Sequence, residues 1–293
     1  LVEDPRVIEI SFEDQPIISL SLGGVDDQGL LTEWGEGLAD ELEKVAGAGQ
    51  AEMIDWYQAA LLAIIQGLTE ILPISSSAHL VIPTLVMGWP DQGLAFDVAV
   101  HVGTLSAVVL YYRKDLLRMA REWLASLAGG RVTDNSRLVW YIGLATIPAG
   151  LVGLSAGDFI ESELRTLPVI ATTTLVFGLL LGVADRRAGR GAQGSTLTLP
   201  MALLIGLAQG LAPVPGVSRS GVTITAALLL GMDRQAAARF SFLLSIPVIA
   251  SAGALKAWEL SHGAVAVDWL LLGFGALLSG VTAYLCIAMF LRL

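Results

Sequence analysis

Val214-Pro-Gly-Val-Ser-Arg-Ser-Gly-Val-Thr223 separates two apolar runs, Leu199–Leu211 before it and Ile224–Leu230 after it. The stretch places Arg219 in apolar surroundings, where a charged side chain is costly and marks a functional site by default. A Pro-Gly pair breaks the helix just before this arginine. Free backbone N–H groups, small hydroxyls and a planar guanidinium are typical of a phosphate site. The alternative is a broken helix whose arginine only pairs with an acid.

The composition indicates a polytopic membrane protein. The 293 residues are 54% hydrophobic and 15% charged, and the mean hydropathy is +0.69. Several runs approach the roughly 20 apolar residues that span a bilayer. The net charge of −10 comes entirely from residues 1–50, with 12 acids and two bases, and the other 243 residues sum to zero. This balance argues against nucleic acid as a partner.

Residues 1–50 are predicted to form a small, acidic α+β extension, separate from a membrane domain at 51–293. Val7–Phe12 and Pro16–Leu22 have the pattern of strands, and Leu30–Val45 that of an amphipathic helix. Three stretches of this segment resemble part of a porter subdomain of resistance–nodulation–division efflux pumps. They are Asp4-Pro-Arg-Val-Ile-Glu-Ile-Ser, Gln15-Pro-Ile-Ile-Ser-Leu-Ser and Leu42-Glu-Lys-Val-Ala-Gly-Ala-Gly. The resemblance implies a fusion.

The membrane domain contains apolar runs of two lengths. Five are predicted to span the bilayer: Phe96–Tyr112, Leu138–Leu154, Leu167–Ala184, Phe240–Trp258 and Trp269–Phe290. The others form two pairs, Ile54–Leu72 with Leu80–Met87 and Leu199–Leu211 with Ile224–Leu230. A Pro/Ser-rich break divides each pair. Interrupted segments at corresponding places in two halves predict re-entrant hairpins at a binding site.

Short stretches of the two halves correspond at a fixed offset. An offset of 143 places Gln66-Gly-Leu on Gln209-Gly-Leu, and Ser75-Ser-Ser77 on Ser218-Arg-Ser220. This predicts an internal repeat, with repeat one at about 54–190 and repeat two at about 197–293. Three spanning helices lie between the hairpins, and because three is odd the repeat is inverted. Repeat two has one spanning helix fewer, so we expect the last helix to be missing, as in a fragment or a fusion product.

Charge predicts the orientation. The segments after Tyr112 and after Ala184 are basic, whereas the segment between the second and third spans carries Asp158, Glu161 and Glu163. The basic side is cytoplasmic by the positive-inside rule. The first hairpin therefore enters from outside and the second from the cytoplasm, so that their broken tips meet near the midplane.

The first hairpin supplies an acid. Gln66 and Glu70 are four residues apart and share one helix face. Glu70 has apolar neighbours, where an unpaired carboxylate is costly, so we expect Arg219 as its partner. A purely structural ion pair is the alternative. His79 follows three serines and is either a proton carrier or a structural histidine at a helix start. His101 has no comparable neighbours and is interpreted as structural.

A carboxylate, a histidine, hydroxyls and an arginine together suit phosphoryl transfer. The chain has no Walker A motif, no H-E-x-x-H motif and no Cys/His zinc spacing. The rival hypothesis is a transporter or flippase for a polyprenyl phosphate or another anionic substrate, since broken helices in inverted repeats are typical of transporters.

Gln66-x-x-x-Glu70, Leu72-Pro-Ile-Ser-Ser-Ser-Ala-His79 and Pro215-Gly-Val-Ser-Arg-Ser-Gly-Val-Thr223 resemble the signatures of the bacitracin-resistance family of undecaprenyl-diphosphatases, and the likeness covers about 54–293. The resemblance implies hydrolysis of undecaprenyl diphosphate to the monophosphate and inorganic phosphate, which recycles the lipid carrier for the cell wall. It also implies a divalent cation (Mg²⁺ or Ca²⁺) and an inverted-repeat fold. The expected location is the bacterial inner membrane, with the active site open to the external, periplasmic side.

The resemblance assigns residues by motif. The catalytic candidates are Glu70, Ser76, His79 and Arg219, the substrate-binding candidates are Gln66, Ser75, Ser218, Ser220 and Thr223, and the metal candidates are Glu70 and Gln66. Glutamine at 66 in place of glutamate costs one potential metal ligand, and Ser77-Ala78 departs from the commoner Thr-Gly. Either Ser76 or His79 is the nucleophile. The partners are a polyprenyl diphosphate lipid and the bilayer; the oligomeric state is open, with a homodimer among the possibilities.

Overall fold

The computed structural model describes residues 7–12, 15–21, 54–188, 197–262 and 268–291, and the chain divides into two compact units, Leu1–Met53 and Ile54–Leu293. In the first unit, β1 (Val7–Phe12) and β2 (Gln15–Ser21) pair antiparallel with a register shift between Ile10 and Ser11. Both strands were predicted. The helix predicted at Leu30–Val45 lies outside the described residues.

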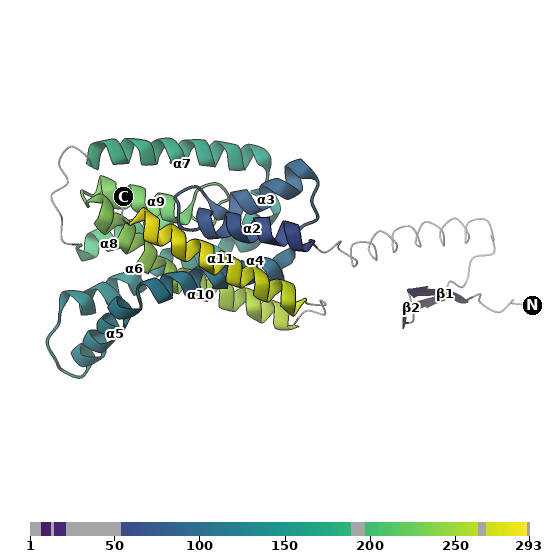
Figure 1. Cartoon of the computed structure of the whole chain (residues 1–293), viewed down its shortest axis with the longest axis horizontal. Coiled ribbons are helices and arrows are strands. Elements are labelled where there is room, and N and C mark those ends of the chain that lie inside the picture. Colours follow the sequence, from purple (N-terminus) through teal and green to yellow (C-terminus); the bar gives the residue numbers. More distant parts are fainter. Residues whose placement is uncertain (1–6, 13–14, 22–53, 189–196, 263–267, 292–293) are drawn as a thin grey trace, which may run out of the picture. The chain divides into compact units, whose positions relative to one another are not determined.

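The second unit is helical throughout its described part (Figure 1). Its elements are α2 (Trp56–Thr69), α3 (Ser76–Met87), α4 (Gly93–Tyr111), α5 (Arg113–Leu127), α6 (Asp134–Glu163), α7 (Leu167–Ala188), α8 (Leu199–Gln209), α9 (Arg219–Leu229), α10 (Arg234–His262) and α11 (Trp269–Phe290). Within the described residues, α4, α6, α7, α10 and α11 are long and apolar enough to cross a membrane. The prediction of a polytopic all-α membrane protein is confirmed, and these helices coincide with the five predicted spans.

The two broken hairpins are α2–α3 and α8–α9. We call their connections the first tip (residues 70–75) and the second tip (residues 210–218). Ser75 and Ser218 close the tips with φ values of 67° and 63°, a left-handed conformation that is uncommon outside glycine. Ser218 also caps α9, since its side chain accepts a hydrogen bond from the Gly221 N–H. The last residues of the two tips, 143 positions apart, thus share a positive φ, and the internal repeat itself stays a prediction.

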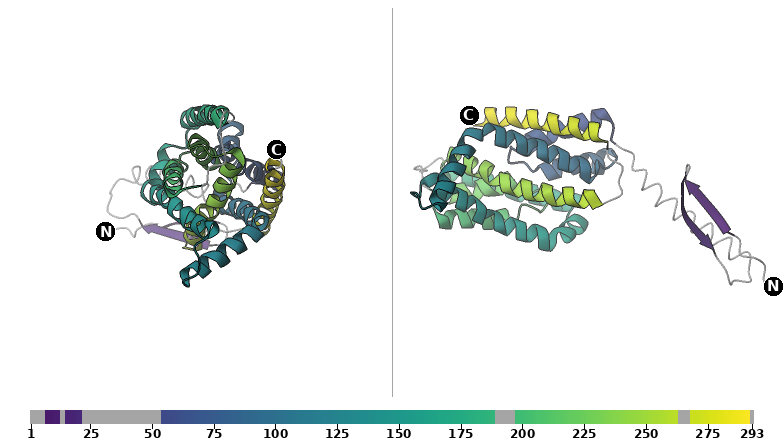
Figure 2. Two further views of the ribbon diagram at one scale, coloured as in Figure 1. Left: turned by 90° about the vertical axis from the view of Figure 1, so that its left-hand side faces the viewer. Right: turned by 90° about the horizontal axis from the view of Figure 1, so that it is seen from below.

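The long helices hold the hairpins in place. In the helical unit α2 packs against α11, α8 against α6, and α9 against both α7 and α10. Figure 2 shows these helices running side by side as one bundle. The α4–α11 contact is close enough that a Cβ on Gly103 would lie 2.1 Å from the Ala276 carbonyl oxygen. Small residues at such crossings allow the backbones to approach, as is usual between membrane helices.

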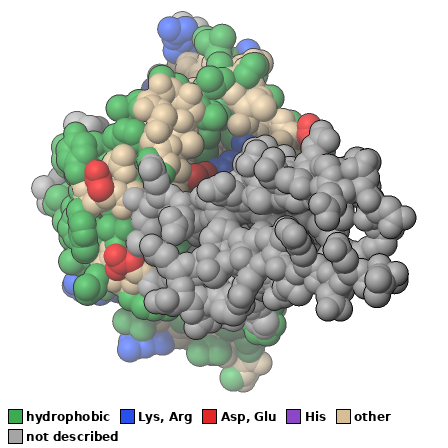
Figure 3. All heavy atoms as spheres, turned by 90° about the vertical axis from the view of Figure 1, so that its right-hand side faces the viewer, with side chains coloured by type: hydrophobic (Ala, Val, Ile, Leu, Met, Phe, Trp, Pro, Cys, Tyr) green, Lys and Arg blue, Asp and Glu red, His purple; other side chains and the backbone are tan. Residues whose placement is uncertain are grey.

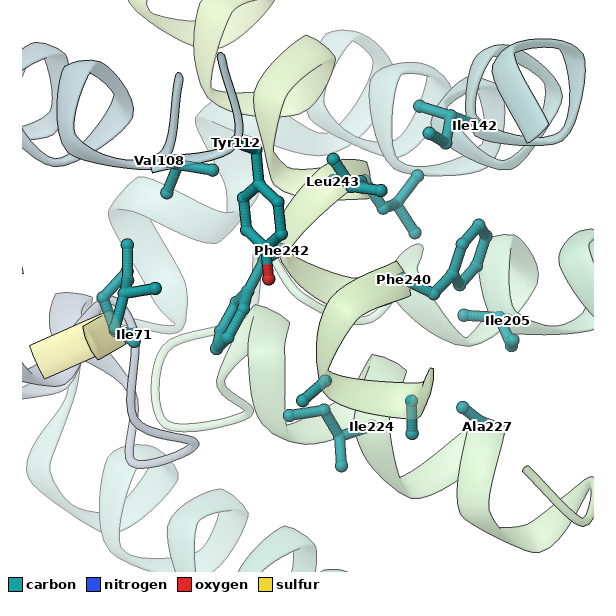
Figure 4. Close-up of a cluster of buried hydrophobic side chains, with 14 of the residues drawn as sticks. Ile71, Val108, Tyr112, Ile142, Ile205, Ile224, Ala227, Phe240, Phe242 and Leu243 are labelled. Atoms are coloured by element: carbon teal, nitrogen blue, oxygen red, sulfur yellow. The ribbon is translucent and has the colours of Figure 1, made fainter. Parts of the chain in front are cut away.

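A buried apolar cluster joins the first tip to the second half of the chain. Ile71 belongs to the same cluster as Ile224 of α9 and Phe242 of α10, and Figure 4 shows the side chains converging. Burial of these groups contributes about 1.5–3 kcal/mol per large side chain. The cluster therefore fixes the position of Ile71, the residue that follows Glu70.

The exterior of the helical unit is apolar. Figure 3 shows hydrophobic side chains over much of one side, and Leu154, Leu179 and Leu277 are 74%, 63% and 69% exposed. Exposed leucines on spanning helices are the expected lipid contacts.

Two regions differ from the prediction. The basic segment after Tyr112 is a helix, α5, with exposed bases and with Asp115 and Glu122 bonded to neighbouring helices or the loop before α6. The segment predicted as a loop after Leu154 instead continues α6 to Glu163. Nothing in that stretch stops a helix, since its acids are compatible with continued helical geometry.

Candidate functional site

The two tips meet at an ion pair. The Arg219 Nη2 donates to Glu70 Oε1 at 2.8 Å, and the two side chains are only 11% and 8% exposed. They are 149 residues apart in the sequence. The predicted contact between the tips is therefore confirmed. A buried pair of this kind requires good geometry and further hydrogen bonds, because removing both charges from water is costly.

The other carboxylate oxygen has its own donors. The Ser76 hydroxyl donates to Glu70 Oε2 at 2.6 Å, and the Gln66 Nε2 donates to the same oxygen at 3.3 Å. Ser76 and Arg219 are the first residues of α3 and α9 and are equivalent under the offset of 143. The side chains of the first residues of two helices thus converge on one carboxylate.

Backbone–hydroxyl bonds hold the tips together. The Ser75 Oγ accepts from the Gly216 N–H at 3.2 Å, and the Ser220 hydroxyl donates to the Leu72 carbonyl at 3.2 Å. Gly216 has φ of +90°, and a Cβ there would lie 2.1 Å from the Thr173 hydroxyl. These serines therefore have structural contacts within the site, and their predicted contact with substrate stays a prediction.

The second half orients the arginine. The Arg219 Nη1 donates to the Ser241 carbonyl at 3.1 Å, and Ser241 Oγ lies 2.8 Å from Thr223 Oγ1. Thr223 is 1% exposed and its hydroxyl also contacts the Arg219 and Ser220 carbonyls. The Nε–H and one N–H on each terminal nitrogen of Arg219 have no acceptor among the described residues. N–H donors of this kind can bind phosphate oxygens, and the choice between a phosphate site and a purely structural ion pair stays a prediction.

The two histidines near the site have different surroundings. His79 Nδ1 lies 2.7 Å from the Ser75 carbonyl oxygen, and its ring makes no ion pair with Glu70 within the described part of the chain. His101, interpreted as structural from the sequence, places Nε2 3.8 Å from Glu70 Oε2 while its Nδ1 contacts the Asp97 carbonyl. Donation by Nδ1 to a carbonyl leaves the Nε2 lone pair toward the site when the ring is neutral.

Sequence reasoning therefore missed His101 and Ser241. A signal for both existed, because one inserted residue between the repeats places Phe96 of α4 on Phe240 of α10. In this register Ser241 corresponds to Asp97, whose carbonyl oxygen lies 2.7 Å from His101 Nδ1. Extending the alignment of the two repeats into the spanning helices would have indicated these parts of α4 and α10 as neighbours of the site.

The site also has oxygen atoms suited to a divalent cation. The Gln66 side chain is fully buried, and its Oε1 has no hydrogen-bond partner among the described residues. A buried amide oxygen without a donor is costly unless something binds it. It belongs to the residue that also contacts the Glu70 carboxylate, and amide and carboxylate oxygens are the ligands that Mg²⁺ and Ca²⁺ take.

The fold and the site define a class: a polytopic helical membrane protein in which two broken hairpins bring one carboxylate, one hydroxyl and one guanidinium together. The family model described as bacitracin resistance protein BacA matches residues 59–293. The chain belongs to this family.

Curated relatives agree with this membership. The chain is 57% identical over 239 residues to a protein of Teredinibacter turnerae named undecaprenyl-diphosphatase, which covers 82% of this chain and 90% of the relative. A protein of the same name from Saccharophagus degradans is 56% identical over 241 residues, which covers 81% and 89%. The matched family range excludes the first 50 residues, whose likeness to an efflux-pump porter fragment stays a prediction.

Proposed function

We propose that this protein hydrolyses undecaprenyl diphosphate to undecaprenyl phosphate and inorganic phosphate, and so recycles the lipid carrier for cell-wall synthesis. The observation that carries the proposal is the joint contact on Glu70, where Ser76 donates to one carboxylate oxygen and Arg219 to the other. The proposed nucleophile (Ser76) and the proposed anion-binding group (Arg219) thereby both contact the proposed base (Glu70). The names of the relatives favour hydrolysis over the transporter alternative.

Ser76 is the proposed nucleophile. Its Oγ attacks the terminal phosphorus, Glu70 accepts the hydroxyl proton, and the phosphoanhydride bond breaks to release the lipid monophosphate. Glu70 then passes its proton to solvent. In the second half of the reaction, water attacks the phosphoserine and gives its proton to Glu70, which returns one to the departing Ser76 Oγ. This restores the enzyme and releases inorganic phosphate.

Arg219 binds the phosphate oxygens and balances the negative charge that builds up in the transition state. Its donors that lack an acceptor among the described residues are the ones assigned to the substrate. When phosphate oxygens bind the Arg219 guanidinium, the ion pair between Arg219 and Glu70 weakens. The Glu70 carboxylate then accepts a proton more readily. The hydroxyls of Ser75, Ser218, Ser220 and Thr223 hold the two tips and the start of α9 in place through their hydrogen bonds, and contact with the phosphate oxygens is the further role assigned to them.

His79 is assigned to proton transfer from its place one turn after Ser76 on the same face of α3. The reverse assignment, with His79 as nucleophile, makes a different prediction. A phosphohistidine is labile in acid and a phosphoserine is not, so the trapped intermediate identifies the residue.

A divalent cation, Mg²⁺ or Ca²⁺, is part of the proposal. Gln66 through its free Oε1 and Glu70 through its carboxylate would hold it. When bound, the cation supplies positive charge that stabilises the negative charge on the phosphate oxygens.

The proposed location is the bacterial inner membrane, with the site open to the periplasm. The support is the charge distribution, since α5 and the end of α7 carry the bases that the positive-inside rule assigns to the cytoplasm. The odd number of spans between the two hairpins inverts them, and this assignment fixes which hairpin enters from the periplasm and which from the cytoplasm. A homodimer stays a prediction that light scattering of the purified protein tests.

Phosphate release by the purified chain in detergent tests the function, because a pure transporter releases none where no second compartment exists. We expect metal-dependent release from a polyprenyl diphosphate and a loss of about 10²-fold or more with Ser76→Ala or Glu70→Gln. Ser77→Ala is the matched control, since Ser77 is exposed and its hydroxyl hydrogen-bonds only to the Ser75 hydroxyl among the described residues. Full release by Ser76→Ala would transfer the role of nucleophile to another group, and full release by Glu70→Gln would refute the mechanism.

A further inference from the structure

The carboxylate at the centre of the site is already neutralised. Arg219 pairs with Glu70 at 2.8 Å, so the two formal charges cancel. The neighbouring helix-face position holds Gln66, an uncharged residue. Among the described residues, no group of three or more His, Cys, Asp or Glu side chains could hold a metal ion. Gln66 and Glu70 are therefore the two side chains that the site itself offers to a dipositive ion, and together with Arg219 they carry no net negative charge.

A divalent cation needs more ligands and more negative charge than these residues supply. Mg²⁺ is bound through one or two carboxylates together with substrate phosphates, and it gives up its waters reluctantly. A cation beside Glu70 is also repelled by the guanidinium that contacts the same carboxylate. A diphosphate changes both conditions, because it adds negative charge and several oxygen ligands, and it draws the guanidinium toward itself.

We infer that the cation binds this site only jointly with the diphosphate group, and that Gln66 is the residue that sets this order. The inference rests on the proposed diphosphate site. Gln66 Oε1, buried and without a partner among the described residues, is the neutral ligand that contacts the cation once the phosphate is present. A glutamate at 66 would lie four residues before Glu70 on the same helix face and would give the protein a net negative cation site of its own.

Direct binding of Mn²⁺ to the full chain in detergent tests the inference without any turnover. Free Mn²⁺ is measured by electron paramagnetic resonance, with and without a polyprenyl methylenediphosphonate, in which a CH₂ group replaces the bridging oxygen. Glu70→Gln is the reference, because it retains every other acidic residue and so reports background binding. We expect no difference between wild type and Glu70→Gln without the diphosphonate, and about one additional equivalent in wild type with it.

The binding must also be reciprocal. We expect the diphosphonate to tighten Mn²⁺ binding by about 100-fold, and Mn²⁺ to tighten diphosphonate binding by the same factor, since the coupling between two ligands is symmetric. Gln66→Glu should bind about one equivalent of Mn²⁺ without the diphosphonate, and Gln66→Leu should reduce the coupling at least tenfold.

One extra equivalent of Mn²⁺ on wild type without the diphosphonate overturns the inference, as does the absence of coupling when both ligands are present. If Gln66→Glu gains no site of its own, Gln66 does not set the order. The proposed hydrolysis fails separately: a chain that binds Mn²⁺ and diphosphonate jointly but releases no phosphate from the natural diphosphate supports this inference and refutes the function.

Discussion

The substitution Arg219→Lys tests whether Arg219 contributes to catalysis or only to the structure. The substitution keeps the positive charge but replaces a planar fork with a single ammonium group. Arg219 bonds to the Glu70 carboxylate through Nη2 and to the Ser241 carbonyl through Nη1. One ammonium at the end of a flexible stem cannot keep both contacts in the same geometry. Arg219→Ala is less informative, because breaking a buried pair costs about 3–5 kcal/mol and threatens folding itself.

The expected magnitudes follow from these contacts. Loss of one hydrogen bond to or from a charged group costs about 1.5–3 kcal/mol, so the free energy of unfolding should fall by that amount. Turnover should fall further, by about 10²–10³-fold, because the lost fork also removes a donor aimed at the transferring phosphate. We expect the effect in kcat as well as in kcat/KM, since the donor acts on charge that develops in the transition state.

The assay is phosphate release from a polyprenyl diphosphate, normalised to the folded fraction from thermal unfolding in detergent. Arg239→Lys is the matched control, because Arg239 donates to Asp115 at 3.1 Å but both side chains are more than a third exposed. That pair should contribute less than about 1 kcal/mol, and turnover should not change. If Arg219→Lys lowers stability while each folded molecule keeps its turnover, the ion pair is structural and the phosphate-binding role is wrong.

Two further predictions concern the helices that support the site. Gly103→Ala should destabilise the protein by about 1–3 kcal/mol through overpacking, because the new Cβ would lie 2.1 Å from the Ala276 carbonyl oxygen. Gly143→Ala is the control, since a Cβ there meets no atom of the described residues within 4 Å; equal melting temperatures for the two variants would contradict this account of the α4–α11 contact. Thr133→Val removes the N-cap of α6, which should cost about 1 kcal/mol. It also removes the hydroxyl that, ahead of Asn135, lowers the pKa of Glu122. A lowered folded-state pKa stabilises above the unfolded pKa and loses this effect as pH falls through the folded value. The difference in melting temperature between wild type and Thr133→Val should therefore narrow in acid to the part that the N-cap contributes. A difference that stays the same or grows in acid would show that Glu122 is not involved.

Much of the membrane domain is readable from local pattern. An apolar run of about 20 residues forms a helix in a bilayer, because a helix satisfies its own backbone hydrogen bonds where no water is present. The same reasoning marks the Pro- and Ser-rich breaks and the costly charges, and so leads to Glu70 and Arg219 as a pair. Length and polarity are properties of a segment, and no tertiary contact is needed to recognise them.

Only the tertiary structure decides how the site is assembled. Ser75 and Ser220 bond to the opposite tip 141 and 148 residues away, and His101 faces Glu70 from a helix that gives no local sign of it. The physical reason is that a hydrogen bond depends on a few tenths of an ångström and on direction. Those are set by the packing of α4, α10 and α11 around the tips. The sequence by itself determined which polar residues lie in apolar segments, where their energetic cost indicates a function. The packing of the helices decided which of these residues contact one another.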